Sequence, residues 1–586
     1  QDHPPLALFL DDLGVHFDAT QPSRLEQRIA EPLGSEQAKR ARLLQGLWCD
    51  QRLSKLNPAQ ESPPPNVPFV LVVDQSAGDC SIALGLAGPR SFQQMLREAL
   101  RDHPDCTVVV KVHPDVIRGR ARGHFRRRDL QHPRIHVCAD GLHPAALLEL
   151  ARAVYVVTSQ MGFEALLWGK PVHCFGMPFY AGWGLTRDRL PAPARRRVGV
   201  ALEALVHAAL VAGTRCVDPH RHRRCSIEEL MQAIGLQRQL QRSTPGRVEA
   251  FGFTPWKQKS LRRFLAGGDV RCRWALSLPG RRAEAIAVWG RRARPRLLLK
   301  AKQRQLPVLR VEDGFLRSVG LGADLIDPIS WVVDRTGMYY DATAPSDLET
   351  LLAQSQWSVA QLQRAADLRQ RLVSEALTKY NLRGSSWQRP ASAGRVVLVV
   401  GQVETDASIR FGAPGLKSNM ALLKAVRRAE PDAFLVYKPH PDVVAGLCRS
   451  GAGEQQADAF CDQVITEGSI SALFAQVDAL HVLTSLAGFE ALLRRVEVHC
   501  WGLPFYAGWG LTQDRHHCSR RGRALSLDGL VHGALIDYPR YVSRQSGWFI
   551  TPEQAIDDLL AWRQAPTARR SLLQALFRHW GRLRHR

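Results

Sequence analysis

Residues 158–189 read TSQMGFEALLWGKPVHCFGMPFYAGWGLTRDR, and residues 484–515 read TSLAGFEALLRRVEVHCWGLPFYAGWGLTQDR. The two stretches align without a gap. Their spacing exceeds half the chain, whereas the units of solenoid proteins run to about 50 residues. The sequence therefore predicts two copies of a whole domain, so each candidate functional residue can be checked against its twin.

The duplication continues on both sides of this stretch. Four further pairs match: LVVDQSAGDCSI with LVVGQVETDASI, VVVKVHPDV with FLVYKPHPDV, FLDDLGVHFDATQPSRLE with VVDRTGMYYDATAPSDLE, and SKLN with TKYN. The second copy also has a long upstream stretch, which includes LPVLRVEDGFLRSVGLG at 306–322. The first copy has no counterpart to it, so we expect the first module to be truncated at its N-terminal side and the chain to be a fragment.

Short apolar runs alternate with helical patterns in both copies. Val- and Leu-rich runs without polar alternation are typical of parallel strands buried on both faces. Helices expected at 90–101 and 417–428 separate such runs, and this alternation indicates Rossmann-type sheets. Region 285–345 adds an earlier α/β half to the second copy. We expect strands at 69–73, 107–111, 153–157, 171–175, 395–400, 434–438, 479–483 and 497–501.

The fold class predicted is therefore α/β, with tandem modules built from Rossmann-type parallel sheets. We expect a first module at 1–240, a second and complete module at 247–565, and a basic amphipathic tail at 566–586. Linkers are expected at 61–68 and 236–250.

The amino-acid composition limits the classes of molecule that the protein is expected to bind. A formal net charge of +24 attracts anions such as phosphorylated substrates, anionic lipid or nucleic acid, although a high Arg content can also reflect genomic base composition. No nucleic-acid recognition motif is found. Hydrophobic residues make up 45% of the chain, but no run of about 18 apolar residues predicts a membrane span. The start of the chain has no signal-peptide pattern.

The cysteines and the tail give two further indications. The twelve cysteines form no CxxC pair, which favours a reducing cytoplasm over a disulfide framework and disfavours a metal site at Cys216 and Cys225. In the tail, Leu, Phe and Trp fall on one helical face and Arg and His on the rest. This pattern favours a helix in an anionic membrane interface, the alternative being a helix docked on the protein.

Four elements of each copy follow strands, where open α/β sheets bind ligands. The first is Asp79 with its twin Asp406, each in a loop after an apolar strand. A carboxylate there suits a nucleophile or a general base, and it equally suits a helix N-cap. Its retention while its neighbours changed favours a functional role.

The second element is a Lys and a His at a strand end, at Lys111 and His113 and again at Lys438 and His440. Both side chains donate hydrogen bonds, and Lys is charged, so the pair suits a phosphate. The alternative is a turn with a solvated Lys. We favour anion binding.

The third element combines hydroxyls at a helix start with a Gly and a Glu. Hydroxyl and N–H groups there can bind an anion, Gly allows a ligand to approach, and Glu can accept from ribose; the alternative is a capped helix. The residues are Thr158, Ser159, Gly162 and Glu164, and Thr484, Ser485, Gly488 and Glu490.

The fourth element is PFYAGWGLT at 178–186 and 504–512, which suggests a rigid aromatic wall for a sugar or base, or else a packed turn. The second copy alone adds Glu312, Asp313 and Arg317. These could hold an acceptor hydroxyl and its anionic group, or form a structural ion-pair cluster.

Together these motifs resemble the KpsC-type (LipB-type) capsule polysaccharide proteins, which are dual-module retaining β-Kdo glycosyltransferases. The resemblance is carried by LPVLRVEDGFLRSVGLG, YYDATAPSDLE, VVDQSAGDCSI, GQVETDASI, KVHPD, KPHPD and both TS…GFEALL…HC…PFYAGWGLT segments. It covers nearly all of residues 1–565.

The resemblance implies GT-B-like modules, each of two Rossmann-type domains, with the first module lacking the front half of its acceptor domain. It implies CMP-Kdo as donor, with β-2,4 transfer by the first module and β-2,7 transfer by the second. The product would be a poly-Kdo linker on lyso-phosphatidylglycerol, made at the cytoplasmic face of the inner membrane of a Gram-negative bacterium. Capsule assembly and export proteins would be partners, and no metal or other cofactor is expected.

The resemblance also assigns roles. Asp79 and Asp406 would be nucleophiles, and Glu312 an acid/base on the acceptor side with Asp313 and Arg317 beside it. Donor binding would fall to Lys111, His113, Thr158, Ser159, Glu164, Lys438, His440, Thr484, Ser485 and Glu490. Two alternatives stay open: another CMP-sugar or glycerophosphate transferase of GT-B type, or a non-catalytic nucleotide-sugar-binding scaffold.

Overall fold

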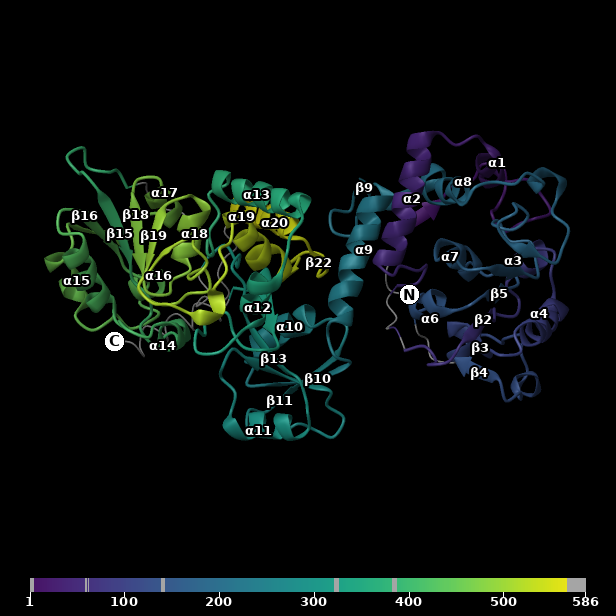
Figure 1. The fold of residues 1–586 in the computed structure, drawn as a ribbon, viewed down its shortest axis with the longest axis horizontal. Coiled ribbons are helices and arrows are strands. Elements are labelled where there is room, and N and C mark those ends of the chain that lie inside the picture. The colour runs from purple at the N-terminus through teal and green to yellow at the C-terminus, as the bar shows by residue number, and fades with distance from the viewer. Residues whose placement is uncertain are drawn as a thin grey trace. The chain divides into compact units, whose positions relative to one another are not determined.

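The computed structural model describes residues 5–57, 61, 63–138, 143–320, 326–381 and 387–565. The chain divides into two compact units, Gln1–Ser243 and Thr244–Arg586, called unit 1 and unit 2 below (Figure 1). The predicted amphipathic tail lies outside the described residues. Among the helices that the structure describes, none has the length and hydrophobicity to cross a bilayer.

Each unit contains a six-stranded sheet in which all neighbouring strands are parallel. The orders are β4-β3-β2-β5-β6-β7 in unit 1 and β17-β16-β15-β18-β19-β20 in unit 2. In both, the chain builds three strands outward, returns past the first and adds three more, which is the Rossmann order. The strands are Phe69–Val73 (β2), Thr107–Lys111 (β3), Ile135–Cys138 (β4), Val154–Val156 (β5), Val172–Cys174 (β6), Arg187–Asp188 (β7), Val396–Val400 (β15), Phe434–Lys438 (β16), Gln463–Val464 (β17), Ala479–Val482 (β18), Glu497–Cys500 (β19) and Gln513–Asp514 (β20).

The eight predicted strands are confirmed to within one residue at each end. The first strands, FVLVV and VVLVV, are buried along their whole length because helices cover both faces. The predicted helices form as Pro89–Asp102 (α4) and Asn419–Ala429 (α15), and each packs its apolar residues on one face of its sheet. The sequence pattern therefore determines these two sheets directly.

Unit 2 has a second, seven-stranded sheet of order β11-β10-β12-β13-β14-β21-β22. Its first four strands are parallel and the rest run antiparallel to their neighbours. The last two come from the far end of the chain, which returns here after completing the other sheet. The strands are Arg247–Phe251 (β10), Asp269–Arg273 (β11), Ala285–Trp289 (β12), Val308–Asp313 (β13), Ser330–Asp334 (β14), Pro539–Val542 (β21) and Phe549–Ile550 (β22).

Unit 1 has a three-stranded antiparallel sheet of order β1-β8-β9, formed by Ala7–Phe9, Thr214–Val217 and Arg224–Cys225. By the sequence repeat these strands correspond to β14, β21 and β22. Among the described residues of unit 1, no strand corresponds to β10, β11, β12 or β13. The predicted fold class, tandem units with Rossmann-type parallel sheets, is confirmed.

The remaining helices cover the sheets. In unit 1 they are Arg24–Ala30 (α1), Ser35–Asp50 (α2), Cys80–Leu84 (α3), Pro114–Ile117 (α5), Ala145–Leu150 (α6), Met161–Leu167 (α7), Leu202–His207 (α8) and Ile227–Arg242 (α9). In unit 2 they are Pro255–Phe264 (α10), Pro295–Gln303 (α11), Asp347–Gln354 (α12), Val359–Ser374 (α13), Ala407–Gly412 (α14), Pro441–Val444 (α16), Ile470–Phe474 (α17), Ala487–Leu493 (α18), Leu527–Val531 (α19) and Pro552–Gln564 (α20).

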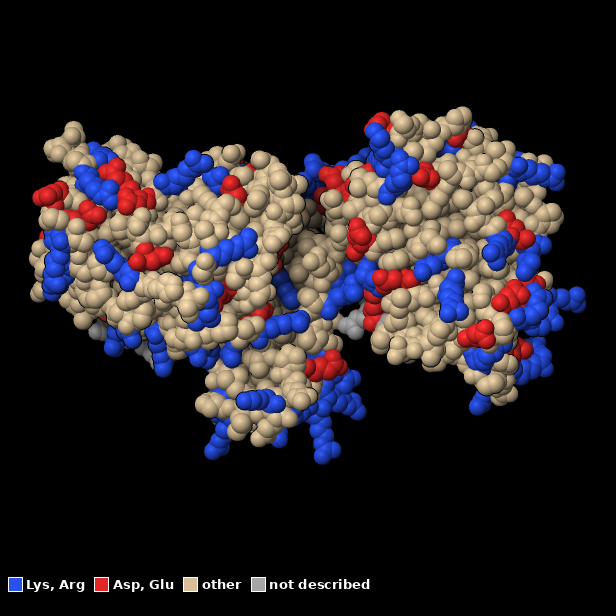
Figure 2. Space-filling view, in the orientation of Figure 1, with Lys and Arg blue, Asp and Glu red and all other residues tan. Residues whose placement is uncertain are grey.

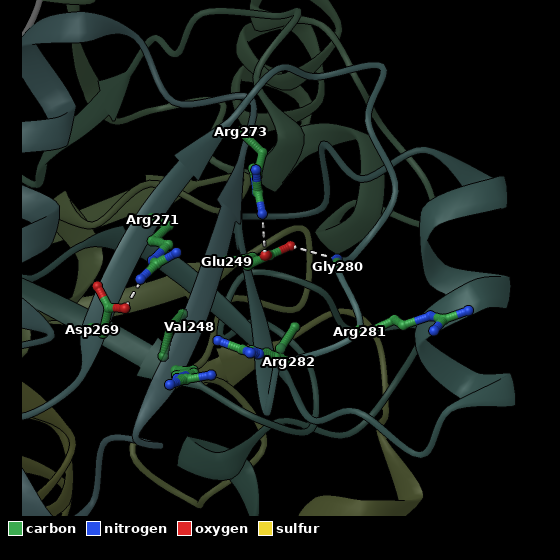
Figure 3. Close-up of a pocket in the computed structure, with 10 residues that line it drawn as sticks. Val248, Glu249, Asp269, Arg271, Arg273, Gly280, Arg281 and Arg282 are labelled. Atoms are coloured by element: carbon green, nitrogen blue, oxygen red, sulfur yellow. Dashed lines mark hydrogen bonds and ion pairs between the residues drawn. The ribbon is translucent and has the colours of Figure 1, made fainter.

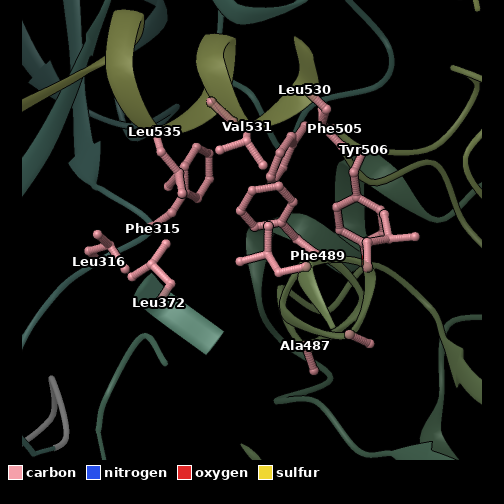
Figure 4. Packing of buried hydrophobic residues seen from close by; sticks show 14 of the residues in the cluster. Phe315, Leu316, Leu372, Ala487, Phe489, Phe505, Tyr506, Leu530, Val531 and Leu535 are labelled. Atoms are coloured by element: carbon pink, nitrogen blue, oxygen red, sulfur yellow. The ribbon is translucent and has the colours of Figure 1, made fainter. Parts of the chain in front are cut away.

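One apolar core joins the two halves of unit 2 (Figure 4). Phe315, from the loop after β13, stacks on Phe505 with ring centroids 4.5 Å apart, and Phe489 of α18 lies against both. Leu372 of α13 and Leu530 of α19 belong to the same core. This packing fixes the loop after β13 to the elements that carry the repeated motifs.

Candidate active site

The repeated motifs meet where the strand order reverses, between the first and fourth strands of each parallel sheet. In unit 1, Gln75 after β2 bridges to Thr158 after β5: the Thr158 amide donates to Gln75 Oε1, and Gln75 Nε2 donates to Thr158 Oγ1, both at 3.0 Å. In unit 2, Gln402 and Thr484 repeat these bonds at 2.8 and 3.2 Å. The glutamines were not predicted as site residues, although their retention in both copies was a usable signal.

Asp79 and Asp406 lie at this switch point, exposed on the loops after the first strands. Each is the N-cap of the next helix, where its Oδ1 accepts from the amide of Ser81 or Ser408 at 2.9 Å. The N-cap interpretation is thus observed. In unit 1, Gln75 Nε2 also approaches Asp79 Oδ2, at 3.4 Å. The nucleophile role of both carboxylates stays a prediction.

His113 and His440 follow the second strands, and their orientation is set by the turn. Nδ1 of His440 accepts from the Asp442 amide at 3.1 Å, and Nδ1 of His113 accepts from the Asp115 amide at 3.2 Å. In the neutral ring Nε2 then carries the proton and can donate to an anion. Burial, together with nearby Lys379, lowers the pKa of His440, against the opposing charge of Asp442.

Lys111 and Lys438 are the last residues of these second strands, and both are buried at the carboxyl ends of the strands. Burial lowers the pKa of both ammonium groups. Lys438 Nζ donates to the Glu467 carbonyl at 3.1 Å, which uses one of its three donors. The predicted anion site therefore has its Lys and His at one strand end in both units.

Ser159 and Ser485 accept hydrogen bonds from the Met161 and Ala487 amides at 3.3 and 3.2 Å, so their hydroxyls lie at the starts of α7 and α18. The N-cap positions themselves are Gln160 and Leu486, which make no side-chain capping bond. The Gly in each helix serves packing, because a Cβ on Gly162 would overlap the Tyr180 hydroxyl. A ligand approach at that glycine was expected from the sequence, and it is excluded by the tyrosine.

Glu164 and Glu490 are buried and bind the repeated SKLN and TKYN segments. Glu164 Oε1 accepts from the Lys55 amide at 3.0 Å, and Glu490 Oε1 accepts from the Lys379 amide at 2.7 Å. Burial raises the pKa of Glu164 to about 7 and also raises that of Glu490. These carboxyl groups hold the segment that faces the site, and their contact with a donor ribose stays a prediction.

In unit 2, Glu312 and Asp313 end β13 and differ in environment. Arg317 Nε donates to Asp313 Oδ2 at 2.7 Å, and the Trp331 indole donates to Oδ1 at 3.2 Å. Although burial opposes it, the charge of Arg317 holds the pKa of Asp313 low. Burial and the Asp313 charge raise the pKa of Glu312 to about 7. Asp313 and Arg317 are thus an ion pair, while Glu312 is the group suited to proton transfer.

Lys379 and Tyr340, which the sequence analysis did not identify, contribute to the electrostatic environment of these acids. The Lys379 ammonium acts electrostatically on Asp313 and Asp406, and the Lys379 carbonyl accepts from the Arg317 and Ser318 amides at 3.3 and 3.2 Å. Burial raises the pKa of the Tyr340 phenol, and the negative charges of Glu312 and Asp406 raise it further. Glu312 from one sheet and Asp406 from the other therefore act electrostatically on the same two residues, Lys379 and Tyr340.

The aromatic loops do not form the predicted ligand wall. Tyr180, Trp183, Tyr506 and Trp509 are fully buried, and the two indole N–H groups donate to the carbonyls of Phe179 and Phe505. Glycines with positive φ let these turns close tightly over their own side chains. The packed-turn alternative is correct, and the wall hypothesis is wrong.

The described residues bring together one cluster of potential metal ligands, Glu430, His481 and His499. The Trp501 indole donates to His481 Nδ1 at 3.1 Å. In the neutral ring, His481 Nε2 then carries the proton and has no lone pair for a metal. The histidine rings stack 4.2 Å apart, as core residues do.

Known proteins resemble this chain either along nearly its whole length or along about half of it. The chain is 37% identical to the capsule polysaccharide modification protein LipA of Neisseria meningitidis serogroup B over 582 residues, covering 95% of this chain and 82% of that protein. It is 37% identical to the lipopolysaccharide-processing protein LpsZ of Rhizobium meliloti over 346 residues, covering 56% and 76%.

Two solved structures are those of Thermosulfurimonas dismutans KpsC, described as β-Kdo 2,7 and β-Kdo 2,4 transferases. The first is 36% identical and covers 54% of this chain and 100% of its own, with a TM-score of 0.43. The second is 33% identical and covers 54% and 98%, with a TM-score of 0.48.

The pattern of the capsule polysaccharide biosynthesis protein family matches residues 34–215, 284–385 and 385–543. These ranges include the switch-point motifs of both units and the β13 acids of unit 2. On this match, and on the extent of its likeness to LipA, the chain belongs to the capsule polysaccharide biosynthesis protein family.

Proposed function

We propose that this protein is a retaining glycosyltransferase that moves Kdo from CMP-Kdo onto a capsule linker carried by lyso-phosphatidylglycerol, through alternating β-2,4 and β-2,7 linkages. Family membership and the 36% and 33% identity to proteins described as β-Kdo transferases support it. The observation that carries it is that Glu312 and Asp406, from two different sheets, both act electrostatically on Lys379 and Tyr340.

In the first step, the Asp406 carboxylate attacks the anomeric carbon of Kdo, and the bond to the CMP phosphate oxygen breaks with its electron pair. His440 donates from Nε2, and Lys438 supplies positive charge, so the leaving phosphate is stabilised. The product of this step is a covalent Kdo ester on Asp406.

In the second step, an acceptor hydroxyl attacks the same carbon and displaces the Asp406 carboxylate. Glu312 takes the hydroxyl proton as general base, a role suited to a carboxyl with a pKa of about 7. Two displacements return the starting configuration. In unit 1 the donor-side set recurs as Asp79, Lys111, His113, Thr158, Ser159 and Glu164, and we propose that it also binds CMP-Kdo.

The proposal is tested by incubating the protein with CMP-Kdo or CMP-sialic acid and a Kdo-terminated lipid acceptor. We expect transfer from CMP-Kdo and, with the donor alone, an intact-mass increase of one Kdo. The control is Asp406→Asn, which keeps an N-cap acceptor, because Asn caps as well as Asp.

In that variant the unit 2 adduct should be absent while the fold persists. Transfer from CMP-sialic acid alone would favour another CMP-sugar transferase. Donor binding without any transfer would favour a scaffold.

A further inference from the structure

A surface segment of unit 2, residues 271–282, comprises the end of β11 and the connection after it, and it exposes three large apolar side chains. Trp274, Leu276 and Leu278 are 86%, 73% and 54% exposed, and they alternate along the loop. Single exposed apolar residues are ordinary, whereas a contiguous group rimmed by charge marks an interaction surface. We call this segment, RCRWALSLPGRR, the docking loop.

The docking loop is a crossover between β11 and β12 that contains no helix. It is nevertheless held firmly. The Arg304 guanidinium donates to the carbonyls of Pro279, Gly280 and Arg281 at 3.1, 2.9 and 2.9 Å. Glu249 of β10 accepts from the Gly280 amide at 2.8 Å (Figure 3). Because these hydrogen bonds anchor residues 279–281, the three exposed apolar side chains belong to an ordered loop.

Arg273 precedes the three apolar residues in the sequence, and Arg281 and Arg282 follow them. The base of the loop borders a hollow of about 190 Å³ lined by five arginines and two acids. Arg271 pairs with Asp269 and Arg273 with Glu249, while Arg281 extends away from the hollow in Figure 3. Figure 2 shows blue side chains projecting from the lobe that carries β10, β11 and α11. The five arginines are Arg247, Arg271, Arg273, Arg281 and Arg282.

We propose that the docking loop binds an anionic lipid bilayer, with Trp274, Leu276 and Leu278 entering the interface and the arginines contacting headgroup phosphates. Trp is favoured at the membrane–water boundary, and apolar area combined with basic charge drives interfacial binding. A nucleic-acid surface would instead offer several aromatic rings for base stacking, and this loop has one.

The position of the loop agrees with this assignment. Trp274 follows the carboxyl end of β11, and Glu312 lies at the carboxyl end of β13, three strand spacings away in the same sheet, or about 14 Å. A bilayer on the docking loop would lie beside the acceptor side of unit 2. The binding itself does not depend on which sugar is transferred.

The test is cosedimentation of the full chain with vesicles of phosphatidylcholine alone or with about one third phosphatidylglycerol. Trp274→Ser/Leu276→Ser/Leu278→Ser should lower the partition coefficient on the anionic vesicles at least tenfold. Arg281→Glu/Arg282→Glu should do so to a similar extent, since each Arg near an anionic surface contributes about fivefold. The tail is present in every variant, so its contribution cancels.

Two matched controls keep the test specific: Leu299→Ser, an exposed apolar residue of α11, and Arg127→Glu/Arg128→Glu, the same charge change in unit 1. Both should bind like the parent. Anionic vesicles should also slow hydrogen exchange of the amides at 274–278. Unchanged binding of both loop variants, equal loss in the controls, or unchanged exchange would overturn the proposal.

Discussion

The same three-stranded element has opposite surroundings in the two units. In unit 2, Trp331 of β14 is 1% exposed because it stacks on Phe264 and meets Trp289 edge-on. Its counterpart in unit 1, Leu8 of β1, is 56% exposed. Among the described residues of unit 1 no strand stands where β13 pairs with β14. Burial here is decided by the neighbouring strands, and the repeated motif alone does not decide it.

The switch-point residues, in contrast, have closely similar surroundings in the two units. The Gln–Thr bridge, the capping Asp, the His turn and the buried Glu recur in both units with nearly equal distances. The duplication thus preserved the switch-point geometry, while the acids of β13 occur in unit 2 alone among the described residues. We infer that donor binding is common to the two units and that acceptor activation is where they differ.

The largest effect is expected from replacing Glu312, one of the β13 acids that distinguish unit 2. Glu312→Gln should lower the transfer rate of unit 2 by about 10²–10⁴, the usual contribution of a general base. In the parent, Glu312 must be ionised, so the rate should rise with pH through about 7, its raised pKa. The variant should lose this limb.

The measurement is the pH–rate profile with saturating CMP-Kdo, and donor affinity is its control. Donor affinity should persist, because the proposed mechanism gives Glu312 a role toward the acceptor alone. A variant that keeps the parent rate at pH 8 would remove Glu312 from the mechanism.

Next come Trp331→Ala and Leu8→Ala, which compare the two edges directly. Losing the buried indole should lower the free energy of unfolding of unit 2 by about 3–5 kcal/mol, because a large cavity forms and Asp313 loses a donor. Leu8→Ala should cost less than about 0.5 kcal/mol, as surface changes do. Urea unfolding followed by hydrogen exchange of each unit checks both. Equal costs would show that Leu8 is covered in solution.

The third prediction concerns the buried Glu164. Its folded pKa is about 7 against an unfolded 4.5, so between these values the folded state keeps a proton that the unfolded state releases. The stability of unit 1 should therefore fall as pH rises from about 4.5 to 7, by about 3 kcal/mol in all.

Glu164→Gln keeps an acceptor for the Lys55 amide and lacks the titration. It should be more stable than the parent at pH 8 and equal to it at pH 4, as judged by urea midpoints. A pH-independent difference between the two proteins would contradict the assignment.

Sequence reasoning recovered what depends on local pattern. Runs such as FVLVV and VVLVV predicted the parallel sheets, because strands buried on both faces must be apolar throughout. It failed where a side chain is defined by a distant segment: Lys379 gains its place from Glu490 and Arg317, which no local spacing reveals. The aromatic loops misled for a related reason, since a repeated Tyr or Trp can be retained for packing as well as for a ligand.

The smallest expected effect tests the conserved bridge itself. Gln402→Leu removes the acceptor of the Thr484 amide, which is buried, so unit 2 should lose about 1–3 kcal/mol of stability. Gln75→Leu should cost unit 1 a similar amount. The Thr484 and Thr158 amides should each exchange faster only in their own variant.

The two variants should then diverge in one respect. Gln75 Nε2 also lies 3.4 Å from Asp79 Oδ2 and 3.5 Å from the Ser81 hydroxyl. Gln402 Nε2 repeats the second approach, to the Ser408 hydroxyl at 3.5 Å. Gln75→Leu should therefore disturb the Asp79 cap as well as the bridge, because the Asp79 carboxylate loses a donor. Hydrogen exchange of the Ser81 and Ser408 amides, which Asp79 and Asp406 cap, measures this in the matched pair. The Ser81 amide should exchange faster in Gln75→Leu, whereas an equal increase at Ser408 in Gln402→Leu would mean that the two bridges are equivalent.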